Sequence, residues 1–349
     1  IPALWIIFCL MRGDRTNSIL SRLVFCAALA LGVGAYQGAR GEDRPLFVFP
    51  VDCRLGDTCV IQNYVDHDAG PGWRDFTCGA MSYDGHDGTD IRIPSLASQR
   101  NGVGVLSIAD GTVLRSRMDM PDRPNLDDGP ESDLRACGNG LVIDHGHGWQ
   151  SQYCHMAQGS LLVRPGDPVK AGQRLGLIGY SGRAAFPYLH LTLRHDGKVI
   201  DPFAPELPSN QCGPSTGGSL FDGSGKITPY IDRFLLNAGF ADGPVTNDEV
   251  EEGRLDLRAP KRSSDALVVY MRAVGLVAGD TMAMALLGPD GVVLAQKVFD
   301  PLDRPKAQVM QFIGRKKPEA GWAPGTYAAV VSILRLGKSL AEKRIFVRI

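Results

Sequence analysis

The chain has 349 residues, more than one typical domain, so we expect two globular units behind a targeting segment. Its 37 Lys and Arg residues balance 38 Asp and Glu residues, and a formal charge of -1 excludes the electrostatic footprint of a nucleic-acid-binding protein. With 42 Gly and 23 Pro residues, the composition favours many short strands, and we predict an all-β protein.

Residues 1–41 are expected to be an export signal that begins at Met11. Arginines precede the apolar stretch 23–33, and Ala35 is a suitable cleavage site. The apolar stretch is shorter than the about 20 residues of an ordinary membrane span. We therefore predict a periplasmic or extracellular protein with no stable membrane span after signal removal. An uncleaved anchor and a lipid attached to Cys26 are the alternatives.

The six cysteines beyond this leader are predicted to form disulfides. They are an even set in a chain bound for an oxidising compartment. A cysteine-rich zinc site is the alternative, but it requires paired C-x-x-C spacings, and the sequence has none. Fifteen pairings are open. The six are Cys53, Cys59, Cys78, Cys137, Cys154 and Cys212.

The first predicted domain covers residues 42–204 and contains all seven histidines. Its apolar runs are punctuated by glycines, as expected of short strands joined by tight turns. The expected strands are 102–113, 140–144, 149–156, 173–178 and 189–195.

Residues 205–225 are rich in Pro, Ser and Gly and are predicted to be a linker. Behind it, 226–349 is predicted to be a small immunoglobulin-like β-sandwich of five to seven strands, acting as a spacer or binding module. Its first stretch, 227–240, has helix-like spacing. The expected strands that follow are 266–272, 281–287, 292–299, 325–334 and 343–349, with hairpin turns at 288–291 and 336–338.

Three segments of the first domain carry candidate reactive side chains. His86 and Asp90 flank Gly88, and their imidazole and carboxylate both suit zinc, although a surface hydrogen bond would give the same pattern. In 187–194, alternation places Tyr188, His190 and Thr192 on one face of a strand and leucines on the other; a polar cleft and a solvated sheet edge both fit.

The third segment contains His145, His147 and His155. Alternation predicts that Tyr153 and His155 share one strand face, while Cys154 points the other way into a disulfide. For His145 and His147, which flank a glycine turn, a structural or solvated role is the preferred interpretation.

Together these segments resemble the lysostaphin-type zinc endopeptidases, which cut peptide cross-links in bacterial peptidoglycan. The resemblance covers about residues 76–203. It rests on His-x-Gly-x-Asp ending at Asp90, on Asp-His-Gly followed by Tyr-x-His ending at His155, and on the x-Leu-His strand ending at His190.

The resemblance implies a mostly antiparallel sheet with a groove and a Zn²⁺ ion held by His86, Asp90 and His190. It also implies that His155 takes part in catalysis. The family's second catalytic histidine is replaced by Tyr188, whose phenol can donate a hydrogen bond to an oxyanion but, with an ordinary pKa of about 10, is a poor base.

The function implied is a zinc metallo-endopeptidase whose substrate is the peptide of peptidoglycan. The alternative is a catalytically impaired relative that binds peptidoglycan or activates a cell-wall hydrolase partner. The intact set of three ligands favours the enzyme, and the tyrosine favours the alternative.

Overall fold

The computed structural model describes residues 47–123, 135–214, 218–221 and 230–349. These described residues all belong to one compact unit. The predicted export signal lies outside the described residues, and the predicted linker lies partly outside them. Within the described ranges, no helix is long and apolar enough to cross a membrane. The predicted domain bounds and the Ig-like topology stay predictions.

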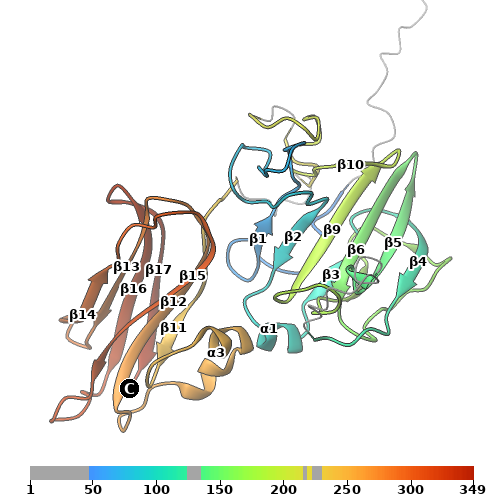
Figure 1. Cartoon of the computed structure of the whole chain (residues 1–349). Coiled ribbons are helices and arrows are strands. Elements are labelled where there is room, and N and C mark those ends of the chain that lie inside the picture. Colours follow the sequence, from blue (N-terminus) through green and yellow to red (C-terminus); the bar gives the residue numbers. More distant parts are fainter. Residues whose placement is uncertain (1–46, 124–134, 215–217, 222–229) are drawn as a thin grey trace, which may run out of the picture. The chain divides into compact units, whose positions relative to one another are not determined.

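An eight-stranded antiparallel sheet dominates the first part of the chain (Figure 1). Its order is β1-β2-β9-β6-β5-β4-β7, and β10 pairs with β9. A separate pair, β3 and β8, completes this part together with the short helix α1. The bounds are β1 Val60–Asn63, β2 Thr89–Arg92, α1 Leu96–Arg100, β3 Gly104–Leu106, β4 Gly111–Arg117, β5 Asn139–Gly146, β6 Trp149–Met156, β7 Pro168–Val169, β8 Arg174–Leu177, β9 Tyr188–His195 and β10 Lys198–Ile200.

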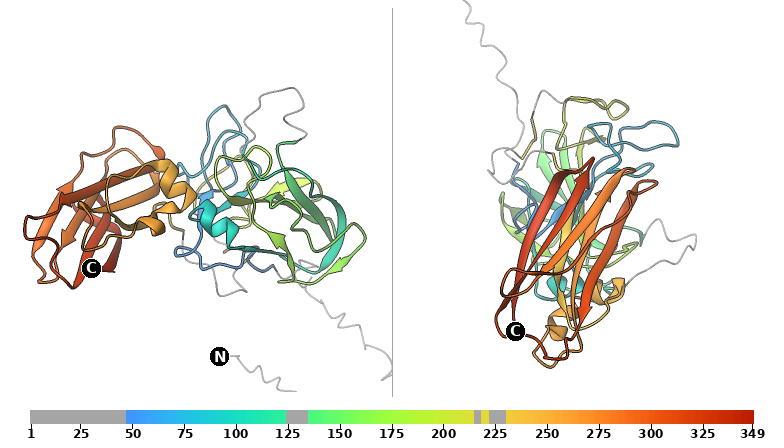
Figure 2. Two further views of the ribbon diagram at one scale, coloured as in Figure 1. Left: turned by 90° about the horizontal axis from the view of Figure 1, so that it is seen from below. Right: turned by 90° about the vertical axis from the view of Figure 1, so that its left-hand side faces the viewer.

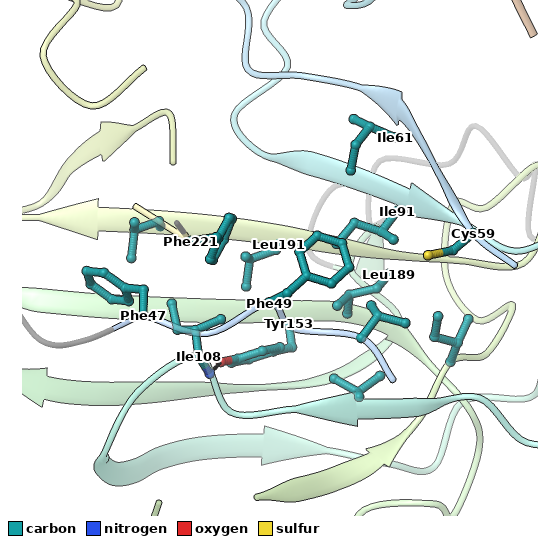
Figure 3. Close-up of a cluster of buried hydrophobic side chains, with 14 of the residues drawn as sticks. Phe47, Phe49, Cys59, Ile61, Ile91, Ile108, Tyr153, Leu189, Leu191 and Phe221 are labelled. Carbon is teal, nitrogen blue, oxygen red and sulfur yellow. Dashed lines mark hydrogen bonds between the residues drawn. The ribbon is translucent and has the colours of Figure 1, made fainter. Parts of the chain in front are cut away.

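One face of this sheet is covered by an apolar core, and the other carries polar side chains. Leu189 and Leu191 of β9 are fully buried, and they lie among Phe47, Phe49 and Tyr153 in the core (Figure 3). Successive side chains of a strand point to opposite faces, so the polar residues between the leucines must point away from this core. The sequence pattern of this strand is thereby confirmed.

Seven strands in residues 230–349 form two antiparallel sheets, with the orders β11-β12-β15 and β14-β13-β16-β17. Their strands run in similar directions (Figure 2), and buried side chains from both sheets make a common core. The bounds are β11 Phe234–Ala241, α3 Asn247–Glu252, the 3₁₀ helix η2 Arg254–Arg258, β12 Ala266–Leu276, β13 Asp280–Leu287, β14 Val293–Val298, β15 Lys306–Lys316, β16 Thr326–Arg335 and β17 Lys338–Arg348.

Both hairpin turns predicted in this region are present. Gly288 to Gly291 joins β13 to β14, with Gly291 in the left-handed region at φ 79°. Leu336 and Gly337 join β16 to β17 at φ 50° and 77°, the sign that a two-residue hairpin turn requires. The all-β prediction is confirmed.

The helix expected at 227–240 is wrong. The described part of that stretch enters β11, whose backbone pairs with β12 from Phe234 to Ala241. Ladder hydrogen bonds along a whole strand outweigh the weak helical spacing of a few apolar residues.

Three disulfides join all six predicted cysteines. The pairs are Cys53–Cys59, Cys78–Cys212 and Cys137–Cys154. The second pair connects residues 134 apart and ties the start of the predicted linker to the loop ahead of β2. The third pair joins the segment before β5 to β6.

Candidate metal centre

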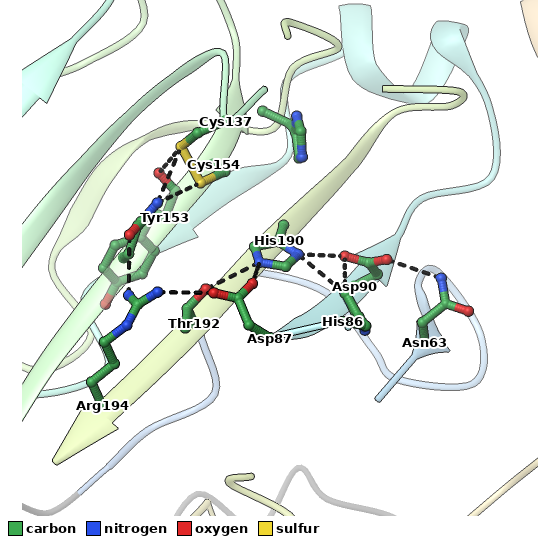
Figure 4. Close-up of polar contacts among 12 residues, drawn as sticks. Asn63, His86, Asp87, Asp90, Cys137, Tyr153, Cys154, His190, Thr192 and Arg194 are labelled. Atoms are coloured by element: carbon green, nitrogen blue, oxygen red, sulfur yellow. Dashed lines mark hydrogen bonds and ion pairs between the residues drawn. A yellow bond between two sulfur atoms is a disulfide. The ribbon is translucent and has the colours of Figure 1, made fainter. Parts of the chain in front are cut away.

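The side chains of His86, Asp90 and His190 meet at one point on the polar side of the sheet (Figure 4). Asp90 of β2 and His190 of β9 are direct cross-strand partners, so their side chains point to the same face. His86 lies in the turn just before β2. Asp90 Oδ1 is 2.9 Å from His190 Nδ1 and 3.2 Å from His86 Nε2, and the two histidine nitrogens are 3.2 Å apart.

Gly88 lets these three residues approach one another. A Cβ atom at this position would lie 2.6 Å from His190 Nε2 and 2.7 Å from the carbonyl oxygen of Leu191. Any side chain here would therefore displace His190 or its strand. The glycine of the His-x-Gly-x-Asp motif is a steric requirement of the site.

Each of the three side chains is oriented by a further polar group. His86 Nδ1 donates to the carbonyl oxygen of Tyr64 at 2.6 Å, which leaves Nε2 free to act as a ligand. Asn63 Nδ2 donates to the second oxygen of Asp90 at 2.9 Å. Outer hydrogen bonds of this kind hold metal ligands in position and fix their tautomers.

His190 is oriented through its other ring nitrogen. His190 Nε2 lies 3.0 Å from Thr192 Oγ1 and 3.3 Å from Asp87 Oδ1, and Arg194 holds that aspartate at 2.9 Å. The sequence motifs did not identify Asp87 or Arg194 as part of the site. Alternation along 187–194 places Arg194 on the face of His190, and that signal could have found it.

The donor set fits a zinc ion. Two imidazole nitrogens and one carboxylate oxygen are common zinc ligands, and in a tetrahedron with bonds of about 2.1 Å the ligand atoms lie about 3.4 Å apart. The three atoms here are 2.9 to 3.2 Å apart, and no rearrangement of the strands is needed to accept the ion. The His190 side chain is 12% exposed, so it keeps some contact with solvent, whereas those of His86 and Asp90 are buried.

The electrostatics of the three residues match a cation site. Burial opposes the charge of Asp90, but the His86 charge and hydrogen bonds from both histidines hold the pKa of the carboxylate well below its usual range. Burial also opposes charge on His190, yet Asp87 and Asp90 outweigh it and raise its pKa to about 9. The carboxylate of Asp90 is therefore ionised and can act as a ligand, and a metal ion must displace the proton of His190 to bind.

His155 lies beside this centre because its backbone breaks the strand alternation. Its φ is 61°, in the left-handed region, and its ring centroid is 6.1 Å from that of His190. Tyr153 points into the core instead, where its hydroxyl accepts a hydrogen bond from the backbone of Ile108 at 2.9 Å. The prediction that Tyr153 and His155 share a face is therefore wrong.

Tyr188 contacts His155 directly. His155 Nδ1 donates to the carbonyl oxygen of Ser181 at 2.8 Å, so Nε2 carries the lone pair and accepts the phenol hydrogen of Tyr188 at 2.8 Å. Burial lowers the pKa of His155 to about 4, and burial raises the pKa of Tyr188 well above 10. Both side chains are neutral near pH 7, one as an acceptor and the other as a donor.

Among the described residues, His145 makes structural contacts outside the metal centre. Its Nδ1 lies 2.8 Å from the carbonyl oxygen of Asp110, and its Nε2 lies 2.7 Å from the hydroxyl of Ser151. His147 occupies the turn between β5 and β6 with a φ of 49°. The structure thus gathers His86, Asp90, His155, Tyr188 and His190 and leaves these two histidines outside.

Comparison with known proteins places this site in a recognised domain. Residues 84–202 match Peptidase family M23. Peptidoglycan DD-endopeptidase ShyA of Vibrio cholerae is 31% identical over 123 residues, which are 35% of this chain and 23% of that protein. Murein hydrolase activator NlpD of Escherichia coli is 30% identical over 126 residues, 36% of this chain and 27% of that protein. The chain thus spans about a quarter of the length of these curated relatives.

A solved structure, a zinc-containing peptidase from Vibrio cholerae, is 26% identical with a TM-score of 0.33, and the alignment covers 48% of this chain and 41% of that chain.

Proposed function

Because residues 84–202 form a peptidase domain of family M23, as the three motifs predicted, we propose that the chain is a zinc-dependent endopeptidase that hydrolyses peptide cross-links of bacterial peptidoglycan. We further propose that it acts outside the cytoplasm, where the three disulfides are stable. The accessory β-sandwich would hold the substrate or a partner.

One observation carries the proposal. Three ligand atoms of the right kind converge on the polar face of the sheet, and each ligand residue has its own orienting partner. A site that only stabilised the fold would not require the ligand atoms of two imidazoles and one carboxylate to lie within reach of a single ion. Three protein ligands with a remaining free position are typical of hydrolytic zinc sites, whereas structural sites use four.

When bound, zinc would polarise the peptide carbonyl and lower the pKa of water. The chain's own residues would then manage protons and orientation. His155, neutral near pH 7, can accept a proton at Nε2 once the phenol of Tyr188 turns away. The Ser181 carbonyl accepts the hydrogen of Nδ1 and so keeps the lone pair of His155 on Nε2.

Tyr188 would act as a hydrogen-bond donor. Its hydroxyl stays protonated because burial disfavours the phenolate, so it can donate to a carbonyl oxygen on which negative charge develops. It cannot replace the missing histidine as a base near neutrality.

The second candidate function is a catalytically impaired protein that binds peptidoglycan or activates a hydrolase. The specific observation in its favour is the hydrogen bond from Tyr188 to His155 Nε2, which occupies the lone pair that a general base needs. The similarity to an activator of murein hydrolases is compatible with it.

The test is digestion of purified peptidoglycan by the chain from Glu42 onward, with zinc supplied. A chelated sample and His155→Ala serve as controls, and cross-linked fragments are quantified by chromatography. The endopeptidase proposal expects loss of these fragments, which stops with the chelator and with the variant. Peptidoglycan that is retained by the zinc-loaded chain but left uncut would favour the binding or activator function instead.

A further inference from the structure

A pocket of about 270 Å³ lies on the polar face of the main sheet, two strands beyond β9. Cross-strand partners connect it to the metal centre: Thr192 of β9 faces Gln152 of β6, which faces Val142 of β5, which faces Arg115 of β4. Residues paired in this way project to one face of a sheet. Arg115 therefore shares the polar face of the sheet with Thr192, whose hydroxyl contacts His190.

A glycine and a disulfide lie on the side of the pocket that faces the metal centre. The Cys137–Cys154 disulfide and Gly140 lie between the strand of His190 and the strand of Arg115, and a Cβ at Gly140 would collide with the carbonyl oxygen of Tyr153. No side chain can rise from this position to divide the pocket from the metal centre. A volume of about 270 Å³ is at the small end of ligand sites and suits one residue of a bound peptide.

The pocket is cationic. Among the described residues that line it, Arg115 and Arg117 are charged and none is acidic. Arg115 is exposed and makes no hydrogen bond or ion pair with the described residues, whereas Arg117 is positioned by donating from Nε to the carbonyl oxygen of Gly138 at 2.7 Å. Arg194, by contrast, is engaged by Asp87 and Gln152.

The distance from the metal centre fits a peptide ligand. Neighbouring strands are about 4.8 Å apart, so three spacings separate β9 from β4 by about 14 Å. An extended peptide advances about 3.3 Å per residue and would reach β4 with its fourth residue, or with its third when the reach of the Arg115 side chain is included.

We propose that this pocket, centred on Arg115, is a specificity subsite that binds a carboxylate-bearing residue of the peptide substrate, three or four residues from the bond that is cut. A planar guanidinium matches a carboxylate through two parallel hydrogen bonds. The inference rests on the proposed endopeptidase function, since it assumes that a peptide lies in the groove.

The test measures binding and does not require cleavage. The ligands are synthetic peptides that are uncharged apart from a single Glu, whose position differs from one peptide to the next. For each of them, a peptide with Gln and a peptide with Lys at the same position are also made. Affinity for the full zinc-loaded chain is measured by calorimetry. The parent should prefer Glu over Gln at one position by about threefold to tenfold, as expected for a partly exposed charge pair.

Arg115→Gln should abolish this preference, and Arg115→Glu should reverse it so that the peptide with Lys binds best. A reversal cannot come from a damaged fold. Arg348→Gln, at an exposed arginine of β17 that makes no ion pair with the described residues, is the matched control and should keep the parent's preference.

No positional preference in the parent, or an unchanged preference in Arg115→Gln, would overturn the subsite. Competition by inorganic phosphate as strong as that of the Glu peptide would also overturn it, because it would identify a general anion site. A preference in a chain that leaves purified peptidoglycan uncut would contradict the endopeptidase function and still support the subsite. Cleavage of peptidoglycan by a chain that shows no preference would contradict the subsite alone.

Discussion

The candidate metal centre depends on one residue that has no side chain. Gly88 packs against His190 so closely that even a methyl group would overlap the imidazole. We expect Gly88→Ala to weaken zinc binding by roughly 10- to 100-fold, the usual cost of disturbing the surroundings of a metal ligand. Competition with a chromophoric chelator measures this affinity.

Gly85→Ala is the matched control for that experiment. Gly85 lies in the same turn with a φ of 71°, but a Cβ there would meet no atom within 4 Å. The substitution should cost about 1 kcal/mol of stability through its strained backbone and leave zinc affinity unchanged. Equal loss of zinc in both variants would show that the turn matters rather than the contact with His190.

Tyr188 is the residue at which the site departs from the family pattern. We expect Tyr188→His to retain zinc and to raise the rate of peptidoglycan cleavage by about tenfold or more, because a neutral imidazole can accept a proton at its ring nitrogen, whereas the phenol stays protonated. Tyr188→Phe removes the hydrogen bond to His155 without supplying a base and should show no such gain. A slower Tyr188→His variant would mean that the phenol itself assists the reaction.

Local motifs predicted most of the residues of the site but not all of their orientations. His86, Asp90 and His190 were found because their spacing reproduces a family motif. The expectation that Tyr153 shares the face of His155 was wrong because a two-residue alternation assumes extended backbone, and the left-handed conformation of His155 reverses it. Asp87 and Arg194 were missed because their part in orienting His190 depends on neighbours distant in sequence.

At the scale of elements, the site exists because β2 and β9 are neighbours in register. Asp90 and His190 are 100 residues apart in the chain and become direct partners through this pairing. The sequence predicted that leucines alternate with polar residues in β9. It did not predict which strands pair with β9. Strand neighbours are decided by long-range packing that one sequence does not display.

Strands in which apolar residues alternate clearly with polar ones were predicted well, and strands without this pattern were missed. β6 and β13 occur close to where their patterns place them. β15, Lys306–Lys316, alternates only weakly and was not expected. Helix α3 was also missed, although Thr246 and Glu249 have the spacing of a capping box, which the sequence alone displays.

The disulfides that brace these elements should differ in strength. In the chain-entropy description, a cross-link stabilises more when it closes a longer loop. We expect removal of Cys78–Cys212, with 134 residues of separation, to lower the free energy of unfolding by about 5 kcal/mol, against about 3 kcal/mol for Cys137–Cys154, with 17.

Double-serine variants, unfolded by denaturant with the remaining disulfides intact, measure these two losses. Equal losses, or a larger loss for Cys137–Cys154, would mean that local strain or residual structure in the unfolded chain outweighs loop length.

In the molecule as a whole, the buried pair His67 and Asp201 joins two parts of the chain that are far apart in sequence. His67 lies 3.1 Å from Asp201, and its other ring nitrogen lies 2.7 Å from the carbonyl oxygen of Gln211. Burial opposes the charge of His67, but the hydrogen bond and charge of Asp201 outweigh it and raise the pKa of the imidazole above 6.5.

This shift predicts a dependence of stability on pH. A raised pKa in the folded state stabilises fully below the unfolded value of about 6.5, and the contribution is lost as pH rises through the folded value. The free-energy difference between the parent and His67→Gln should therefore be larger at pH 5.5 than at pH 9, in metal-free protein unfolded by denaturant. A difference that grows with pH would contradict the protonated pair.

We propose that one zinc ion, held by His86, Asp90 and His190, supports cleavage of peptidoglycan. The most direct measurement titrates metal-free chain with zinc while cleavage and bound metal are recorded together. Activity should rise in proportion to zinc and level off at one equivalent, and His190→Ala should neither bind that equivalent nor cleave. Cleavage that persists without zinc, or equal zinc occupancy in His190→Ala, would contradict the account.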